Sequence, residues 1–234
     1  MKKALATVFV MFTCCALHSQ DFNTIVGDWI RVKAEYKDGR KLPNNHHSRI
    51  IVRYYFTKKE IYQVSSGITT PCVYTQTGNF LKIEPVLGLI IEEYNDKVLT
   101  LVEANEAEPI RYYMIPIDSF QRSGGFKYPF EVIGADTIYA NTPGIEPIYP
   151  KGNSEFMNGI VTGFTQKVVF NFSYVVQKDG TIGDVTIKAS SNPKLDSRLI
   201  KLVKKSSGKW IPATYKGKPI NVRQSHSLSL NNRT

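Results

Sequence analysis

The residues that could serve catalysis or metal binding are few, and they form no familiar pattern along the sequence. His46 and His47 are adjacent, which rarely lets both rings face one ion, and no further ligand follows at a suitable spacing. Glu92 and Glu93 would point to opposite faces of a strand, so they cannot act as a pair of acids. Cys72 has no histidine near it in sequence and is expected as a small buried apolar residue. We therefore expect no catalytic residues, no metal site and no cofactor.

The first twenty residues have the layout of a secretory signal sequence, which we assign to residues 1–20. Two lysines precede an apolar run from Ala4 to Phe12, and polar residues follow. Cys14 and Cys15 leave attachment of a lipid at the N-terminus as an alternative. No later run approaches the roughly 20 apolar residues of a membrane-spanning helix. The sequence thus predicts an exported chain with no transmembrane segment in its mature form.

Charge separates the two halves of the chain. Residues 151–234 contain 14 Lys and Arg against 4 Asp and Glu, a net charge of +10, whereas residues 21–150 contain 14 against 16, a net charge of −2. A basic half of this kind is typical of proteins with an anionic partner, such as an acidic protein face, a lipid head group or a cell-wall polymer. A solvated basic face is the alternative. Export argues against nucleic acid.

Short strands are the main elements expected before residue 118. Within residues 49–56, Val52, Tyr54 and Phe56 alternate with Arg53 and Tyr55, which places the two sets on opposite faces of a strand. Similar runs recur at a spacing of about 10 residues, with turns between them. The pattern predicts an antiparallel β-barrel or sandwich over residues 21–118.

The remainder of the chain changes character twice. Residues 119–150 are rich in glycine and proline, which indicates a linker or an ordered strap between two domains. In residues 151–234, two alternating runs flank Asp179-Gly180, the signal of a hairpin. An apolar stripe that begins after Pro193 predicts a helix, and a last strand follows. We expect an α+β domain with a three-stranded antiparallel sheet and a packed helix.

This second half resembles the C-terminal domain of the TonB family over residues 136–230. The resemblance is carried by VVFNFSYVVQKDGTIGDVTI for the hairpin, SSNPKLDSRLIKLVKKSSGKWIP for the helix and its exit, and YKGKPINV before the last strand. Leu199 and Ala213 depart from the family, where a small alanine and a glycine are usual. The fold that the resemblance implies is the α+β domain already expected.

The TonB resemblance also implies a binding mode. In the family, the last strand offers its open edge to a short extended peptide, the TonB box of an outer-membrane receptor. The corresponding partner-binding strip here consists of Asn221, Val222, Arg223, Gln224 and Ser225, with Arg223 able to meet an acidic side chain. The alternative is a last strand that is covered within its own protein. His226, the next residue, is expected at the surface or in contact with the partner.

A TonB energy transducer also has a membrane anchor and a long proline-rich spacer, and this sequence shows neither. We therefore expect a non-catalytic protein of a Gram-negative cell envelope, periplasmic or associated with the outer membrane. It would bind a TonB-dependent receptor or another envelope protein without transducing energy.

The first half resembles lipocalin-like domains over residues 25–118. The resemblance rests on Gly27-x-Trp29 at the start of a first strand and on the strand series after it. It implies a barrel in which four tyrosines could line a cavity for one small apolar ligand. These are Tyr36, Tyr55, Tyr74 and Tyr113. A solid core filled by side chains is the alternative, and carriage of a hydrophobic ligand is the second functional hypothesis.

Overall fold

The computed structural model describes residues 24–85, 87–124 and 127–230. The proposed signal sequence, with Cys14 and Cys15, lies outside the described residues. Within the described residues, no helix has both the length and the apolar character needed to span a membrane.

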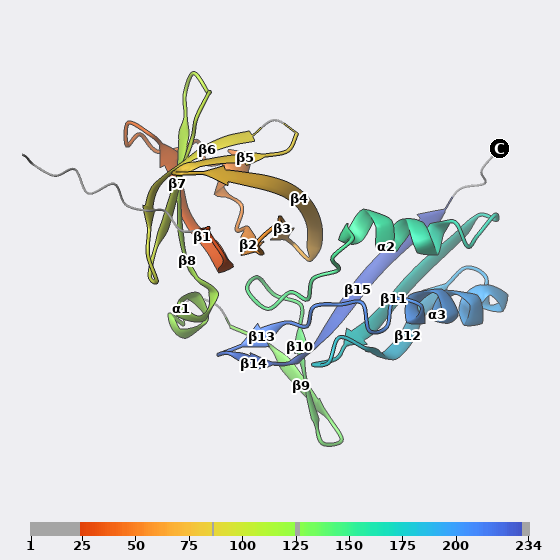
Figure 1. Ribbon diagram of the computed structural model, residues 1–234. Coiled ribbons are helices and arrows are strands. Elements are labelled where there is room, and N and C mark those ends of the chain that lie inside the picture. The colour runs from red at the N-terminus through yellow and green to blue at the C-terminus, as the bar shows by residue number, and fades with distance from the viewer. Residues whose placement is uncertain (1–23, 86, 125–126, 231–234) are drawn as a thin grey trace, which may run out of the picture.

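A closed antiparallel barrel forms the first part of the chain, which is one of the two architectures that the strand pattern predicted (Figure 1). Each strand pairs with the next, and the first pairs with the eighth, which leaves no open edge. The strands are β1 (Gly27–Tyr36), β2 (Arg53–Phe56), β3 (Glu60–Ser65), β4 (Ile68–Thr77), β5 (Phe80–Ile83), β6 (Leu87–Tyr94), β7 (Leu99–Glu103) and β8 (Ile110–Pro116). A 3-10 turn, η1 (His47–Arg49), lies between β1 and β2, and a short helix, α1 (Ile117–Arg122), follows β8.

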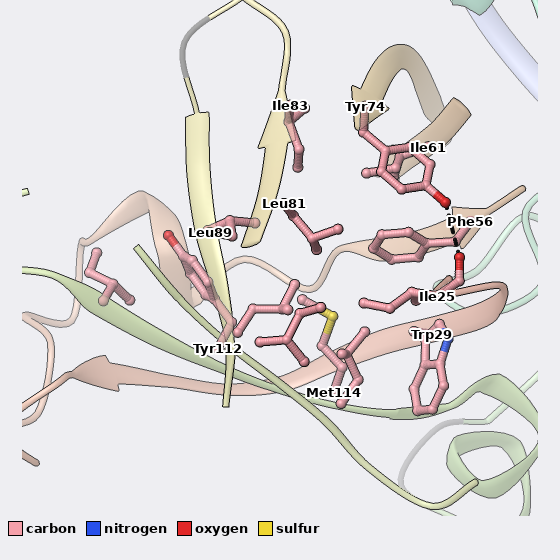
Figure 2. Close-up of a cluster of buried hydrophobic side chains, with 14 of the residues drawn as sticks. Ile25, Trp29, Phe56, Ile61, Tyr74, Leu81, Ile83, Leu89, Tyr112 and Met114 are labelled. Carbon is pink, nitrogen blue, oxygen red and sulfur yellow. Dashed lines mark hydrogen bonds between the residues drawn. The ribbon is translucent and has the colours of Figure 1, made fainter. Parts of the chain in front are cut away.

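The barrel interior is occupied by side chains. Alternate residues of the strands point inward and form one buried apolar cluster, part of which is drawn in Figure 2. Trp29 belongs to this cluster and packs edge-on against Tyr94, with 5.9 Å between ring centroids. Leu81, Leu99 and Leu101 are almost fully shielded from solvent. Packing of this kind is typical of a small barrel whose core is solid.

The second part of the chain is a five-stranded sheet in the order β12-β11-β15-β10-β9. Two helices pack on one of its faces, and their apolar residues join those of β11 in a single cluster (Figure 1). The strands are β9 (Phe130–Ile133), β10 (Asp136–Ala140), β11 (Val168–Val176), β12 (Ile182–Ser190) and β15 (Asn221–Leu230), and the helices are α2 (Gly152–Val161) and α3 (Asp196–Lys204). A 3-10 turn, η2 (Pro193–Leu195), leads into α3, and β13 (Thr214–Tyr215) pairs with β14 (Lys218–Pro219).

The sequence predicted a sheet of three antiparallel strands, whereas the structure has a sheet of five, two of which the sequence did not predict. β11, β12 and β15 are antiparallel, and β10 then adds to β15 in parallel, with β9 outside it. Both added strands come from the segment between residues 119 and 150, which therefore acts as an ordered strap. The pairing of β10 with β15 joins residues about 80 apart, so no local pattern announces it.

Arg53 lies at the junction between the barrel and the strap. Its guanidinium group binds both carboxylate oxygens of Asp28, at 2.7 and 2.5 Å, and donates a third hydrogen bond to the backbone oxygen of Glu146. Asn153 adds a second connection, because its side chain accepts from the Thr69 N–H and donates to the Gly67 carbonyl. The barrel and the C-terminal sheet are thus joined by buried polar contacts.

Candidate functional site

The predicted partner-binding strip on β15 is largely occupied by the protein itself. Asn221, Val222 and Arg223 pair with Ile138, Tyr139 and Ala140 of β10, so this part of the strand has no open edge. The Gln224 side chain accepts a hydrogen bond from the Asn141 side chain at 3.1 Å. Ser225 is exposed. The edge of β15 at which the TonB resemblance predicted peptide binding is therefore covered by β10 over the first three residues of β15.

Arg223 also finds its acidic partners within the chain. Its Nε lies 2.7 Å from a carboxylate oxygen of Glu131 on β9, and Nη2 lies 2.8 Å from one of Asp184 on β12. The side chain thus spans the sheet from β15 toward both outer strands. In this structure, Arg223 is thus paired with two carboxylates of its own sheet, both on half-exposed side chains.

The free apolar edge of this sheet lies at β9. Phe130 and Val132 are 62% and 64% exposed, Ile133 is 49% exposed, and the β9–β10 hairpin extends away from the rest of the sheet in Figure 1. β12, the opposite edge strand, differs because its pairing with β11 is interrupted by two irregularities and its exposed residues are mostly polar. Bulges and polar residues are the usual protection of a sheet edge, and β9 has only Glu131.

The register of the hairpin shows which backbone groups of β9 are free. Ala140 donates to the Pro129 carbonyl, and hydrogen-bonded pairs alternate along an antiparallel ladder. Glu131 and Ile133 therefore turn their backbone groups toward β10, while Phe130 and Val132 turn theirs outward. These two residues offer two N–H donors and two carbonyl acceptors to an added strand.

A row of aromatic rings leads from the interior to the free edge. Phe130 lies 5.8 Å from Tyr139, Tyr139 lies 5.6 Å from Tyr215, and Tyr215 lies 5.1 Å from Tyr128, measured between ring centroids. Tyr139 and Tyr215 pack against the buried cluster that contains Val222. The exposed Phe130 ring is therefore held in position by the packed Tyr139 ring next to it, and it can contact an apolar side chain of an added strand.

Two hollows lie on the sheet near this edge. The first has a volume of about 510 Å³ and is lined by β9, β10 and β15, including Glu131, Ile138 and Arg223. The second, of about 450 Å³, continues from Ser225 toward β11 and includes Lys188. Ile138, Arg223 and Ser225 alternate with residues of the helix-covered side, so both hollows belong to the face without helices.

Of the four tyrosines predicted to line the barrel, two belong to its core. Tyr74 is buried, and its hydroxyl donates to the carbonyl oxygens of Ile25 and Thr57, the first of which is marked in Figure 2. Burial raises the pKa of Tyr74. Tyr36 is half-buried and packs against the same cluster, with the Arg40 guanidinium above its ring.

Tyr55 and Tyr113 face away from the barrel interior, so the prediction that they line it is wrong. Tyr55 stacks on Tyr62 in a small cluster with Ile148 of the strap. The Tyr113 hydroxyl donates to the Glu35 carboxylate at 2.6 Å. The reason is the two-residue period of a strand, since their neighbours along β2 and β8 are the residues that point inward.

The sequence did not identify a buried cation inside the barrel. Arg31 is 7% exposed; it donates to the Ile50 carbonyl at 2.6 Å, and its guanidinium carbon lies 5.1 Å from the centre of the Tyr112 ring. The Tyr112 hydroxyl in turn donates to Glu103. Burial, aided by this bond, raises the pKa of Tyr112. The arginine follows Trp29 on the inward face of β1, which is the signal that could have found it.

The side chains considered for chemistry have ordinary surroundings. His46 and His47 stack on each other, Glu92 pairs with Arg111, and burial raises the pKa of Cys72, which disfavours its thiolate. The described residues contain no group of three or more His, Cys, Asp or Glu side chains placed to hold a metal ion. His226, expected at the surface or in contact with the partner, is half-buried; its ring stacks on that of Tyr174, and its Nε2 lies 3.1 Å from the Tyr174 hydroxyl.

The exposed edge of β9 and the adjoining hollow on the helix-free face thus form the candidate interaction site. Comparison of the chain with protein-family models, with curated proteins and with solved structures gives no match.

Proposed function

We propose that this protein is a non-catalytic binding protein of the cell envelope, which takes up an extended segment of a partner protein by strand addition at β9. The observation that carries the proposal is the apolar edge strand, whose residues Phe130 and Val132 are more than half exposed. An edge of this kind is a template for a further strand. Main-chain hydrogen bonds would supply affinity, and pockets for alternate side chains would supply specificity.

The resemblance to the TonB C-terminal domain supports the same mode of binding but places it on a different strand. Since β10 covers Asn221–Arg223, the sheet is extended outward and β9 becomes the strand that meets the partner. The partner is an envelope protein with an exposed extended segment, of which the TonB box of an outer-membrane receptor is one example. Such a protein would act in the periplasm or at the outer membrane.

Carriage of a small hydrophobic ligand is not adopted as a second function. The closed barrel is compatible with a lipocalin-like fold, but apolar side chains fill its interior. In our proposal the barrel is a rigid support for the strap from which the β9–β10 hairpin extends.

Strand addition can be tested with Val132→Pro. The substitution removes an outward N–H while leaving the bonds between β9 and β10 in place, because proline is tolerated on the open side of an edge strand. Heptapeptides selected for binding to the wild-type protein from a random library should bind this variant about tenfold more weakly or worse. Val132→Thr, which keeps the N–H and the branched shape, is the matched control and should retain most of the affinity.

Amide hydrogen exchange gives an independent result for the same complex. Bound peptide should slow exchange of the Phe130 and Val132 N–H groups and leave those of Glu131 and Ile133 almost unchanged. Undiminished binding to the proline variant, or no protection of Phe130 and Val132, would show that the peptide does not add to β9.

A further inference from the structure

The C-terminal domain carries a row of cations along the outer side of α3. Lys194, Arg198, Lys201 and Lys205 are all exposed and follow one another at intervals of four, three and four residues. This spacing places Arg198 and Lys201 on one face of α3, and the row is continued by Lys194 in the 3-10 turn η2 before the helix and by Lys205 at its C-cap. We call this row the basic stripe. The opposite side of the helix is apolar, with Leu199 and Val203 buried in the core.

The basic stripe has no internal counter-charge in the described part of the chain. None of its four members forms an ion pair with a carboxylate there, although ten ion pairs occur elsewhere. The acid on α3 is Asp196, which is half-buried and has one carboxylate oxygen shielded from solvent without a partner. Lys204 and Lys209 add two exposed cations at the end of the helix.

Stabilisation of the helix accounts for only half of this arrangement, because Lys201 and Lys205 lie at the C-terminal end of α3, where cations are favourable. Cations are unfavourable at the N-terminal turn of a helix, yet Arg198 lies in the first turn of α3 and Lys194 lies in the 3-10 turn just before it. Like charges three or four residues apart also repel, and the stripe contains three such pairs. Arg198 has a partial local role, since its guanidinium carbon lies 5.6 Å from the centre of the Phe164 ring. The repulsion among these charges would be relieved by an external polyanion.

We propose that the basic stripe docks the C-terminal domain on a membrane surface that contains anionic lipid head groups. The stripe spans about 16 Å at 1.5 Å per residue, so its charges face a surface at several points. Its members line none of the hollows on the sheet, which argues for contact with a surface rather than for a single small anion. Clusters of four to eight basic residues on a helix are typical of attraction to anionic lipid. This surface is separate from β9, so the proposal does not rest on the peptide-binding function.

The test uses the chain from residue 21 onward and vesicles of phosphatidylcholine with or without phosphatidylglycerol. At low salt the protein should sediment with the anionic vesicles, stay in solution with neutral ones, and be released at high salt because screening weakens the attraction. Lys201→Gln with Lys205→Gln should lower the affinity about tenfold or more. Lys201→Arg with Lys205→Arg should bind as the wild type does.

The matched control is Lys58→Gln with Lys59→Gln, which removes the same charge from an exposed turn of the barrel. This pair should leave vesicle binding unchanged, and thermal unfolding should show that both double variants are folded. An equal loss of vesicle affinity in the two Lys→Gln double variants, or no loss in the α3 double variant, would overturn the assignment to the basic stripe. Binding to soluble polyglutamate without binding to anionic vesicles would overturn it in favour of an acidic protein partner.

Discussion

Glu146 is a buried acid placed beside a charge pair that is already balanced. Its side chain accepts a hydrogen bond from the Gly144 N–H, and its backbone oxygen accepts from Arg53, whose guanidinium group also holds Asp28. Burial raises the pKa of Glu146 more than the nearby Arg53 lowers it. The folded state therefore holds this proton more tightly than the unfolded state does.

A raised pKa of this kind makes stability depend on pH. The contribution of Glu146 is fully present below the unfolded-state pKa, about 4.3, and is lost as pH rises through the folded-state pKa. We expect Glu146→Gln to increase the free energy of unfolding at neutral pH by about 1.4 kcal/mol for each unit by which the pKa is raised. Urea unfolding of the variant and the wild type from acid to neutral pH measures this difference in the free energy of unfolding. The difference should vanish in acid. An equal gain at every pH would contradict this account.

At the scale of elements, the hairpin between β11 and β12 is fixed to the exit of α3. Gly180 has a positive φ of 81°, and a Cβ there would collide with the backbone oxygen of Trp210. Its carbonyl accepts from the Gly208 N–H at 3.0 Å. The Trp210 ring is buried, and its Nε1 donates a hydrogen bond to Ser206. These contacts hold the residue in place, so its backbone carbonyl cannot easily move away from Gly180.

Gly180→Ala should therefore destabilise the protein through two effects, whereas Gly134→Ala should do so through one. Gly134 has a φ of 62°, but a Cβ there meets nothing within 4 Å, so only the backbone strain of roughly 1–2 kcal/mol applies. Gly180→Ala adds displacement of the Trp210 backbone, and we expect a loss at least 1 kcal/mol larger. Denaturant unfolding of the two variants measures the difference, and equal losses would show that the loop at Trp210 gives way freely.

Local patterns in the sequence were sufficient for most elements and insufficient for the site. Alternation predicted the strands of the barrel. Asp179-Gly180 predicted the hairpin between β11 and β12, and the apolar residues around Leu199 at helical spacing predicted α3. The same alternation already places Tyr55 with Arg53 on the outer face of β2, so its assignment to the interior could have been avoided. β9 and β10 are short and lie in a segment rich in glycine and proline, but Gly134 between two apolar runs was a usable hairpin signal. Their attachment to β15 depends on distant residues and could not be read locally.

At the scale of the whole molecule, Arg53 connects the barrel to the strap and is itself shielded from solvent. Arg53→Met would leave the half-buried Asp28 carboxylate without its partner and the Glu146 carbonyl without a donor in a buried setting. Breaking a buried pair in this way costs about 3–5 kcal/mol. We expect calorimetry to show a large loss of stability and two separate transitions, because the barrel and the sheet no longer unfold together.

Arg40→Met is the matched control for that experiment. Arg40 also contacts two acids, Asp38 and Glu108, but all three side chains are more than half exposed. Exposed pairs contribute about 0–1 kcal/mol, so this variant should unfold almost as the wild type does. A small effect of Arg53→Met, similar to that of Arg40→Met, would mean that the junction is held by its apolar contacts instead.

The position of β15 within its sheet has a consequence for how the chain folds as it is made. β11 and β12 can pair as a hairpin once both have been synthesised, and β9 and β10 can do the same, but β15 lies between the two hairpins. They cannot form one sheet until the residues of β15 have emerged, and β15 is the last strand described along the chain. The edges of β10 and β11 that face β15 therefore stay open until β15 has been synthesised, and until then each can pair with a wrong strand. A chain that leaves the cell's interior before it folds would meet this hazard only after transport, when β15 is already available to close the sheet.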